Sequence, residues 1–147
     1  MEGSTTVTQL LRSKGTRIWS VGPDVTVYDA LALMAEHDVG ALPVLHDGAL
    51  VGIVSERDYA RKVILQGRAS RDTKVREVMT ADVVTVAPEA TMQVCRRLMT
   101  ERRIRHLPVV RDGTLMGIVS IRDVVEATLA EQAFLIEQLQ GYIQGTV

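Results

Sequence analysis

The sequence predicts an α+β fold in which two β-α-β-β-α repeats pack with pseudo-twofold symmetry. The first observation is a repeat: segment 21–58 recurs without a gap as segment 86–123, and 18 of the 38 aligned residues are identical. The second is that each copy combines a stretch of helical periodicity with two β-rich runs. The third is length, because 147 residues suit one domain whereas a copy of about 60 residues is marginal alone. We therefore expect the two copies to share an apolar interface and to fold together.

Each repeat is expected to begin with a short strand and to continue into a helix. The strands are 18–21 and, 65 residues later, 83–86. Pro23 follows the first strand, and Asp24 or Thr26 is expected to cap the next helix, because apolar residues then recur at helical spacing. The second copy repeats this pattern.

A β-hairpin and a second helix complete each repeat. In the first copy the β-rich runs 39–45 and 50–54 are joined across Asp47-Gly48, and glycine supplies the positive φ that such turns need. Ser55 then begins a helix that is expected to run to Leu65. The second copy has the same dipeptide and the same serine 65 residues later.

The chain divides into a first repeat at 8–66, a second repeat at 73–129 and a C-terminal helix and tail at 130–147. A helix-like lead-in precedes the core of each repeat, at 8–14 and 73–79. The tail continues a helix that is rich in Glu and Gln and carries an apolar stripe. Two interpretations stay open: this helix packs on its own domain, or it forms a dimer contact.

Composition argues against several classes of protein. No apolar run approaches the ~18–20 residues of a membrane span, and residues 1–4 have neither the basic flank nor the apolar core of a secretion signal. Cys95 is the single cysteine, which excludes an intramolecular disulfide and fits a reducing cytoplasm. A net charge of −1 and only five aromatic residues make nucleic-acid binding a weak alternative. We expect a cytoplasmic protein that has no membrane segment.

Two phrases that occur in both copies resemble a known family. They are Leu-Pro-Val at 42–44 and 107–109, and Gly-Ile-Val-Ser-x-Arg-Asp at 52–58 and 117–123. Both phrases stand at the same offset from the hydrophobic helices in the two copies. With this arrangement, each copy resembles the CBS domain, named after cystathionine β-synthase. The pair resembles the tandem-CBS (Bateman) module over nearly the whole chain. The resemblance implies two mixed sheets with helices around a pseudo-twofold axis, clefts between the halves that hold adenosine-containing ligands, and dimerisation.

The phrase Ser-x-Arg-Asp, at 55–58 and 120–123, follows a strand and begins a helix. A carboxylate suits the two adjacent hydroxyls of a ribose, and a serine beside free N–H groups at a helix start suits a phosphate. The structural alternative is that the serine is an N-cap and the aspartate complements the helix dipole. With the family resemblance, we favour ribose binding by Asp58 and Asp123.

The two expected clefts differ in their residues. The resemblance implies that the first combines an adenine pocket from the first repeat with Asp123 and with Arg105, whose guanidinium can hold a phosphate in a bidentate contact. In the second, which contains Asp58, the bulky Arg105-His106 intrudes on the base, and Gly40-Ala41 supplies no cation. We therefore expect the first cleft to bind more tightly.

The resemblance carries a set of candidate ligand-binding residues onto this sequence. Within it, Trp19 could instead be a packing residue and His106 an ordinary hairpin histidine. Three further arginines of the second repeat, Arg96, Arg97 and Arg103, are expected on the solvated surface. The candidate ligand-binding residues are Thr16, Ile18, Trp19, Val39, Gly40, Ala41, Pro43, Ser55, Arg57, Asp58, Val83, Val84, Ile104, Arg105, His106, Ser120, Arg122 and Asp123.

These expectations predict a stand-alone regulatory module that binds an adenine nucleotide and signals to an unidentified partner protein as a homodimer. AMP is the favoured ligand, and ADP, ATP, NAD(H) and S-adenosylmethionine are alternatives. A scaffold protein with vestigial clefts is the rival interpretation. Catalysis is not expected, because the chain has no phosphate-loop, G-x-G-x-x-G or H-E-x-x-H motif, and Cys95 lies on an apolar helix face. The three histidines lack the spacing of zinc ligands, so no metal is expected.

Overall fold

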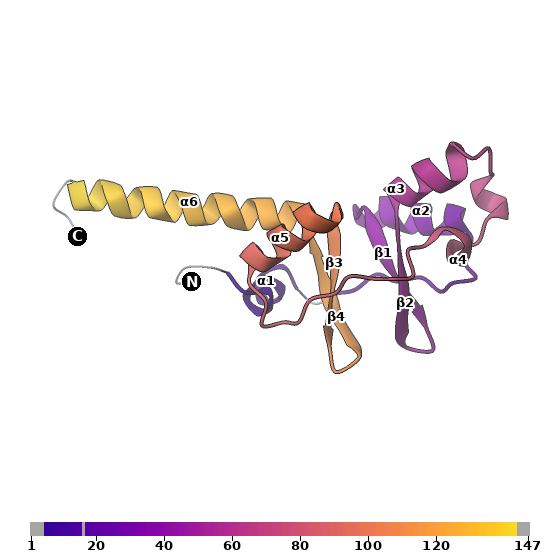
Figure 1. Ribbon diagram of the computed structural model, residues 1–147, viewed down its shortest axis with the longest axis horizontal. Coiled ribbons are helices and arrows are strands. Elements are labelled where there is room, and N and C mark those ends of the chain that lie inside the picture. The colour runs from indigo at the N-terminus through magenta and orange to yellow at the C-terminus, as the bar shows by residue number, and fades with distance from the viewer. Residues whose placement is uncertain (1–4, 16, 144–147) are drawn as a thin grey trace.

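The computed structural model of the protein describes residues 5–15 and 17–143, so the predicted site residue Thr16 lies outside the described residues. Two small two-stranded sheets stand side by side, each covered by its own helices (Figure 1). The first half contains α2 (Val27–His37), β1 (Ala41–His46), β2 (Ala49–Ser55), α3 (Glu56–Tyr59) and the π-helical turn η1 (Ala60–Ile64). The second half contains α5 (Met92–Arg102), β3 (His106–Arg111), β4 (Thr114–Ser120) and α6 (Ile121–Ile143). The short helices α1 (Val7–Lys14), η2 (Ser70–Asp72) and α4 (Val75–Val78) lie outside these sets.

The two hairpins confirm the predicted Asp-Gly turns. His46 pairs with Ala49, so the loop is the two residues Asp47 and Gly48, with φ values of 51° and 80°. Positive φ at both central residues is the type I′ geometry that matches the twist of the flanking strands. The second hairpin repeats this turn and also the irregularity in register that follows Val44 in the first. The pseudo-symmetry therefore extends to individual backbone conformations.

The expected first strand of each repeat is much shorter than the sequence predicts. Segments 18–21 and 83–86 form no strand; each contributes one parallel bridge, Val21 to Val44 and Val86 to Val109. Val21 donates its N–H to Pro43 and accepts from Leu45. Pro23, two residues later, has no N–H to donate, which stops the pairing from continuing beyond Val21. Residues 18–20 and 83–85, before each bridge, form no ladder.

The first helix of each half begins and ends in the same way. The Thr26 side chain accepts from the N–H of Asp29, so Thr26 and not Asp24 is the N-cap. The helix ends at Asp38, which takes the left-handed conformation with φ of 52°. In the second half Thr91 and Arg103 have these roles. In the first half the expected second helix divides into the four-residue α3 and η1.

The lead-in helices are exchanged between the halves. Val7 and Leu11 of α1, at the N-terminal end of the chain, belong to the apolar core of the second half, and Figure 1 shows α1 beside α5 and β4. Val75 and Val78 of α4 belong to the core of the first half. A Cβ on Gly117 would lie 2.7 Å from a methyl carbon of Leu11, so α1 packs directly on β4. Because each core needs a helix from elsewhere in the chain, the halves fold together.

α6 continues the second helix of the second repeat into the tail without interruption for 23 residues. Its first turns pack on the body, where Val124 is buried and Ala127 lies against the core. Every residue from 132 to 140 is exposed, and the helix projects away from the body (Figure 1). Within the tail, Glu131 accepts from the Thr5 N–H at 3.1 Å, so the interpretation that the tail packs on its own domain holds only for its beginning. Among the described residues, no helix is both long and apolar enough to span a membrane.

Candidate functional site

Two clefts lie between the halves, one on each side of the interface that joins them. The first has a volume of about 800 Å³ and the second about 310 Å³. Clefts of about 300–1,000 Å³ are typical of sites for small molecules and cofactors. The first cleft brings together ten predicted residues: Ile18, Trp19, Val39, Gly40, Ala41, Arg105, His106, Ser120, Arg122 and Asp123. The second brings together Ser55, Arg57, Asp58, Val83, Val84 and Ile104, and it also contacts Gly40, Arg105 and His106.

One wall of the first cleft is apolar and comes from the first half. Ile18 and Trp19 lie on the extended segment before α2, and the cleft continues along Val39, Gly40 and Ala41 into β1. Trp19 is half-buried and packs against the core of its half. Its indole stacks on the ring of His37, with centroids 3.4 Å apart and planes 9° apart. Trp19 is thus a packing residue that also forms part of the cleft wall.

The opposite wall of the first cleft is polar and is formed by the start of α6. Ser120 and Asp123 cap this helix reciprocally: the Ser120 N–H donates to Asp123 Oδ2 at 2.8 Å, and the Asp123 N–H donates to Ser120 Oγ at 3.2 Å. Lys14 Nζ, from α1, donates to the same carboxylate oxygen at 2.7 Å. Within the described part of the chain, no hydrogen bond reaches Oδ1. The carboxylate therefore caps α6, as the structural alternative predicted, and still has an oxygen that can accept from a ligand.

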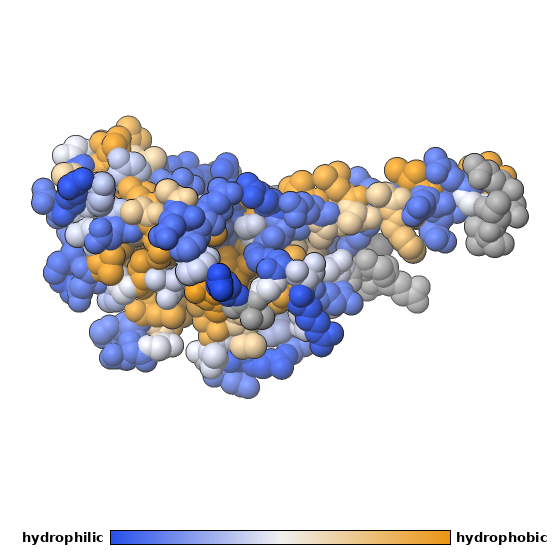
Figure 2. Space-filling view, turned by 180° about the vertical axis from the view of Figure 1, so that it is seen from behind, coloured by the Kyte–Doolittle hydropathy of each residue, from blue (hydrophilic) through white to orange (hydrophobic). Residues whose placement is uncertain are grey.

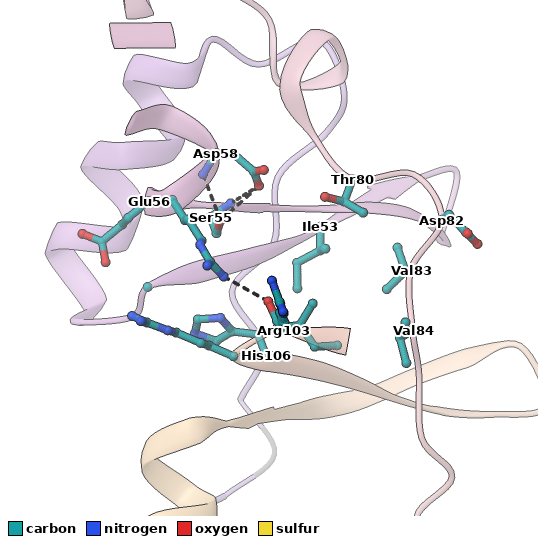
Figure 3. A pocket seen from close by; sticks show the side chains of 14 residues that line it. Ile53, Ser55, Glu56, Asp58, Thr80, Asp82, Val83, Val84, Arg103 and His106 are labelled. Carbon is teal, nitrogen blue, oxygen red and sulfur yellow. Dashed lines mark hydrogen bonds between the residues drawn. The ribbon is translucent and has the colours of Figure 1, made fainter. Parts of the chain in front are cut away.

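The second cleft contains the equivalent pair, Ser55 and Asp58. Asp58 Oδ2 accepts from the Ser55 N–H at 2.9 Å and from Ser55 Oγ at 3.0 Å, and Lys62 Nζ lies 3.0 Å from Oδ1. Figure 3 shows this pair at one end of the cleft and Arg103 and His106 across from it. Both carboxylate oxygens of Asp58 are thus engaged, which distinguishes it from Asp123.

The arginine of each Ser-x-Arg-Asp phrase reaches across the interface between the halves to an equivalent residue of the other half. Arg57 Nη1 donates to the carbonyl oxygen of Arg103 at 3.0 Å (Figure 3). Arg122 Nη1 lies 3.9 Å from Asp38 Oδ2. Asp38 and Arg103 are the equivalent left-handed residues at the ends of α2 and α5. Arg122 is held more weakly than Arg57, so its guanidinium is more available to a ligand in the first cleft.

Four residues form a wall shared by both clefts: Gly40, Glu56, Arg105 and His106. A Cβ on Gly40 would lie 3.1 Å from Glu56 Oε1 and 3.5 Å from the His106 ring, so only glycine fits there without movement. Burial lowers the pKa of His106, and the nearby Arg105 lowers it further. His106 is therefore a neutral, half-buried ring at pH 7, whereas Arg105 is exposed to both clefts.

Several residues of the clefts were missed by the sequence interpretation. Lys14 and Arg17 line the first cleft, Glu56 lines both, and Arg103 lines the second although it was expected only on the solvated surface. Arg96 and Arg97 are exposed and line neither cleft. The repeat offered a signal for two of these residues, because Lys14 aligns with Met79 and Glu56 with Ile121. Such charge differences between equivalent positions mark places where the halves have diverged.

Pro43 and Cys95 lie away from the clefts. Pro43 is buried in β1 and pairs with Ile53. Cys95 is fully buried, and burial raises the pKa of its thiol to about 11, so it is an inert core residue. Within residues 5–15 and 17–143, no group of three or more His, Cys, Asp or Glu side chains could hold a metal ion.

The chain is similar to known proteins over most of its length. A family model described as the CBS domain matches residues 14–64 and 75–130. The CBS domain-containing protein CBSX3, mitochondrial, of Arabidopsis thaliana is 45% identical over 152 residues, which cover 97% of this chain and 73% of that protein. A solved structure of a CBS-domain protein from Burkholderia ambifaria is 49% identical, with a TM-score of 0.83 over 87% of this chain and 96% of that chain.

An enzyme also matches, but only in part. The inosine-5'-monophosphate dehydrogenase of Korarchaeum cryptofilum is 39% identical over 106 residues, which cover 71% of this chain and 21% of the enzyme. The similarity therefore leaves most of that enzyme unmatched. The two copies, the exchanged lead-in helices, the two clefts and the matches over both repeats agree with one another. The chain belongs to the CBS domain family and contains two CBS domains in tandem.

Proposed function

We propose that the protein is a regulatory CBS pair that binds an adenine nucleotide, with AMP as the favoured ligand, in the first cleft. The observation that supports this most strongly is the composition of the two facing walls. An apolar wall from one half suits a planar base, and the Asp123 carboxylate of the other half retains an oxygen for a ribose hydroxyl. Each half supplies only part of the site, so a ligand there contacts both.

The charges of the first cleft suit a phosphate. Lys14, Arg17, Arg105 and Arg122 all line it. Lys14 is already paired with Asp123, whereas Arg122 has only the distant contact with Asp38. Arg105 and Arg122 are therefore the residues that we assign to the phosphate, because a guanidinium can hold phosphate oxygens in a bidentate contact.

The first cleft is favoured over the second for two physical reasons. The second has less than half the volume, and the side chains of Arg103, Arg105 and His106 line it. Its carboxylate, Asp58, has both oxygens engaged by Ser55 and Lys62. Gly40 supplies no cation, as the sequence interpretation noted, but Arg57 and Arg103 also line this cleft. We therefore base the expected weaker binding on size and on the engaged carboxylate.

Regulation requires that the ligand favour one arrangement of the halves. A ligand shifts such an equilibrium only by its difference in affinity for the two arrangements. The contacts of Arg57 with Arg103 and of Arg122 with Asp38 join the halves at the cleft edges. A ligand that binds Arg122 therefore competes with the contact between Arg122 and Asp38. We propose that this change is transmitted to a partner protein, and that the protein acts as a homodimer and not as an enzyme. A cytoplasmic location stays a prediction, which cell fractionation tests, since the Arabidopsis relative is named as mitochondrial.

Calorimetric titration with AMP, adenosine, ADP, ATP, NAD(H) and S-adenosylmethionine tests the proposal. AMP is expected to bind with one tight site per chain and to raise the melting temperature, because a ligand that binds only the folded state stabilises it. S-adenosylmethionine has no phosphate, so Arg105→Ala distinguishes it from the nucleotides. Mass spectrometry of small molecules released from the purified protein identifies a ligand that the titration set omits. If no adenine compound binds at millimolar concentration, the scaffold interpretation replaces the proposal.

A further inference from the structure

The projecting part of α6 leaves a largely apolar surface uncovered. Large apolar side chains that pack on the body are buried, whereas Ile136 is 55%, Leu139 54% and Ile143 82% exposed. Figure 2 shows apolar residues gathered along one side of this helix where it leaves the body. A surface of this kind on a projecting helix marks an interaction site.

The exposed residues follow a heptad pattern. Spacings of four and three alternate through Val125, Leu129, Gln132, Ile136, Leu139 and Ile143. This is the alternation of a and d positions in a coiled coil, with Leu129, Ile136 and Ile143 at a and Val125, Gln132 and Leu139 at d. We call these six residues the seam. The seam points away from Val124 and Ala127, which face the body, because successive residues are separated by about 100° around a helix.

We propose that the seam is the surface through which two copies of the protein pair, in a parallel two-stranded coiled coil. The proposal takes the homodimer of the proposed function further, by assigning its surface and its register. The C-terminal part of the seam has Ile136 and Ile143 at a and Leu139 at d, and isoleucine at a with leucine at d favours two parallel strands. The N-terminal part has the reverse arrangement, with Leu129 at a and Val125 at d, so the preference comes from the projecting end of the helix.

Gln132 and the charges on α6 point to a second copy as the occupant. Gln132 lies in the middle of the seam, and in a parallel pair it faces the Gln132 of the other copy. A side-chain amide both donates and accepts, so two facing amides can hydrogen-bond to each other. A polar residue at a single core position of a coiled coil commonly fixes the register of the two helices. From residue 123 to residue 143 all charged side chains are acidic, which disfavours an anionic membrane, since interfacial helices are rich in Lys and Arg.

Like charges do not oppose this pairing. Glu131 and Glu137 occupy outward positions c and b, and Glu131 accepts from the Thr5 N–H of its own chain at 3.1 Å. The g positions that flank the seam hold Thr128, Leu135 and Tyr142, none of them charged. In a parallel pair Thr128 and Leu135 face the uncharged e positions Ala133 and Gln140 of the other copy. Glu126 is at an acidic e position and faces Ile121 at g, not another carboxylate.

The exposed area is enough for a small stable interface. Full burial of a large aliphatic side chain removes roughly 60–120 Å² of apolar surface from water. Seven large aliphatic side chains and one tyrosine on or beside the seam are 39% to 82% exposed, so each copy offers roughly 250–500 Å². Two copies together would bury twice this apolar area, roughly 500–1,000 Å². A small stable interface buries about 1,200 Å² in total, of which about 60% is apolar, so the two areas are similar. The eight are Ile121, Val125, Leu129, Leu135, Ile136, Leu139, Tyr142 and Ile143.

The molar mass of the full-length Ile136→Glu and Phe134→Glu variants, measured by light scattering, tests whether the seam is the dimer interface. Both side chains are exposed, at 55% and 61%, so neither substitution disturbs the core, but Phe134 lies off the seam. Wild type and Phe134→Glu are expected at twice the chain mass of 16.2 kDa, and Ile136→Glu at the mass of one chain. A wild type of one chain mass at every concentration overturns the homodimer itself. A dimer that survives Ile136→Glu leaves the homodimer standing and overturns the seam.

Oxidative crosslinking of Gln132→Cys tests the register, with Gln138→Cys as the matched control. Native Cys95 is buried, so we expect it not to crosslink. A parallel pair brings the two d positions within the Cα separation that a disulfide requires, whereas position 138 points outward. Rapid dimer formation by Gln132→Cys alone is the expected result. Equal crosslinking of both variants, or crosslinking of neither while Ile136→Glu is monomeric, overturns the parallel register.

Discussion

Lys14 Nζ lies 2.7 Å from Asp123 Oδ2, so the first helix of the chain supplies the cation that neutralises the carboxylate at the start of the last helix. The Lys14 ammonium also donates to the carbonyl oxygen of Ile118 in β4. Met79 stands at the equivalent position of the second repeat, and there Lys62 neutralises Asp58 from within the same helical segment. Lys62 also donates to the carbonyl oxygen of Val78 in α4, so each carboxylate is linked through a lysine to the lead-in helix that packs on its half.

A double-mutant cycle measures this ion pair. Lys14→Met and Asp123→Asn are each expected to lower the free energy of unfolding, and their coupling is expected to be about 0.5–1 kcal/mol, because the pair is partly exposed and screened. Urea unfolding of the four proteins gives the coupling. Pairing Lys14→Met with Asp58→Asn is the control and should be additive. Additivity in both cycles would show that the contact contributes nothing to stability.

Asp123→Asn is expected to weaken AMP binding more than Asp58→Asn does. Both carboxylates accept from the N–H of the capping serine three residues earlier, and the asparagine Oδ1 can accept the same bond, so the two variants are matched in their structural effect. Loss of a charged acceptor for a ribose hydroxyl costs ~1.5–3 kcal/mol, or roughly ten- to hundredfold in Kd. Calorimetric titration of both variants makes the comparison. Equal losses would mean that the two clefts bind equivalently.

Arg105→Ala is expected to weaken binding of AMP by roughly ten- to hundredfold and to change adenosine binding little. The reason is that only AMP presents a phosphate to the guanidinium. Arg97→Ala is the control, since Arg97 is exposed and lines neither cleft. The assignment of Arg105 to the phosphate is wrong if both ligands lose affinity to the same extent.

Gly117→Ala is expected to destabilise the protein by ~1–3 kcal/mol through overpacking. The added Cβ would lie 2.7 Å from a methyl carbon of the buried Leu11, so the Leu11 side chain or α1 would have to shift. Gly22→Ala is the control, because the nearest atom there is 3.9 Å away and the change should cost little. Chemical unfolding measures both variants, and a Gly117→Ala protein as stable as wild type would show that α1 does not pack tightly on β4.

His106 is expected to make stability depend on pH. Its pKa in the folded protein lies below the usual 6.5 because of burial and Arg105, while Asp123 acts in the opposite direction. Below pH 6.5 the unfolded chain therefore binds this proton more readily, and stability falls as the pH is lowered toward the folded pKa. His106→Gln should flatten the dependence of unfolding free energy on pH between 7 and 5. An unchanged slope would show that this proton is not linked to folding.

The sequence was sufficient for features that depend on neighbouring residues. The Asp-Gly dipeptides determine both hairpin turns, since these turns need positive φ at both central residues. Thr26 was one of two possible caps, and the choice between it and Asp24 depended on which side chain reaches the N–H of Asp29. The 65-residue repeat predicted two similar halves, and both are present.

What only the tertiary structure decided are relationships between distant segments. Three such relationships depend on how the halves pack: α1 completes the core of the second half, Lys14 reaches Asp123, and Arg103 faces the second cleft. The same holds for segments 18–21 and 83–86, whose apolar residues suit a strand but which bridge at one residue each. Local dihedral preferences and capping hydrogen bonds act within a few residues, so a sequence pattern displays them. Cleft volumes and ion pairs across more than a hundred residues arise from packing, which a pattern along the chain does not specify.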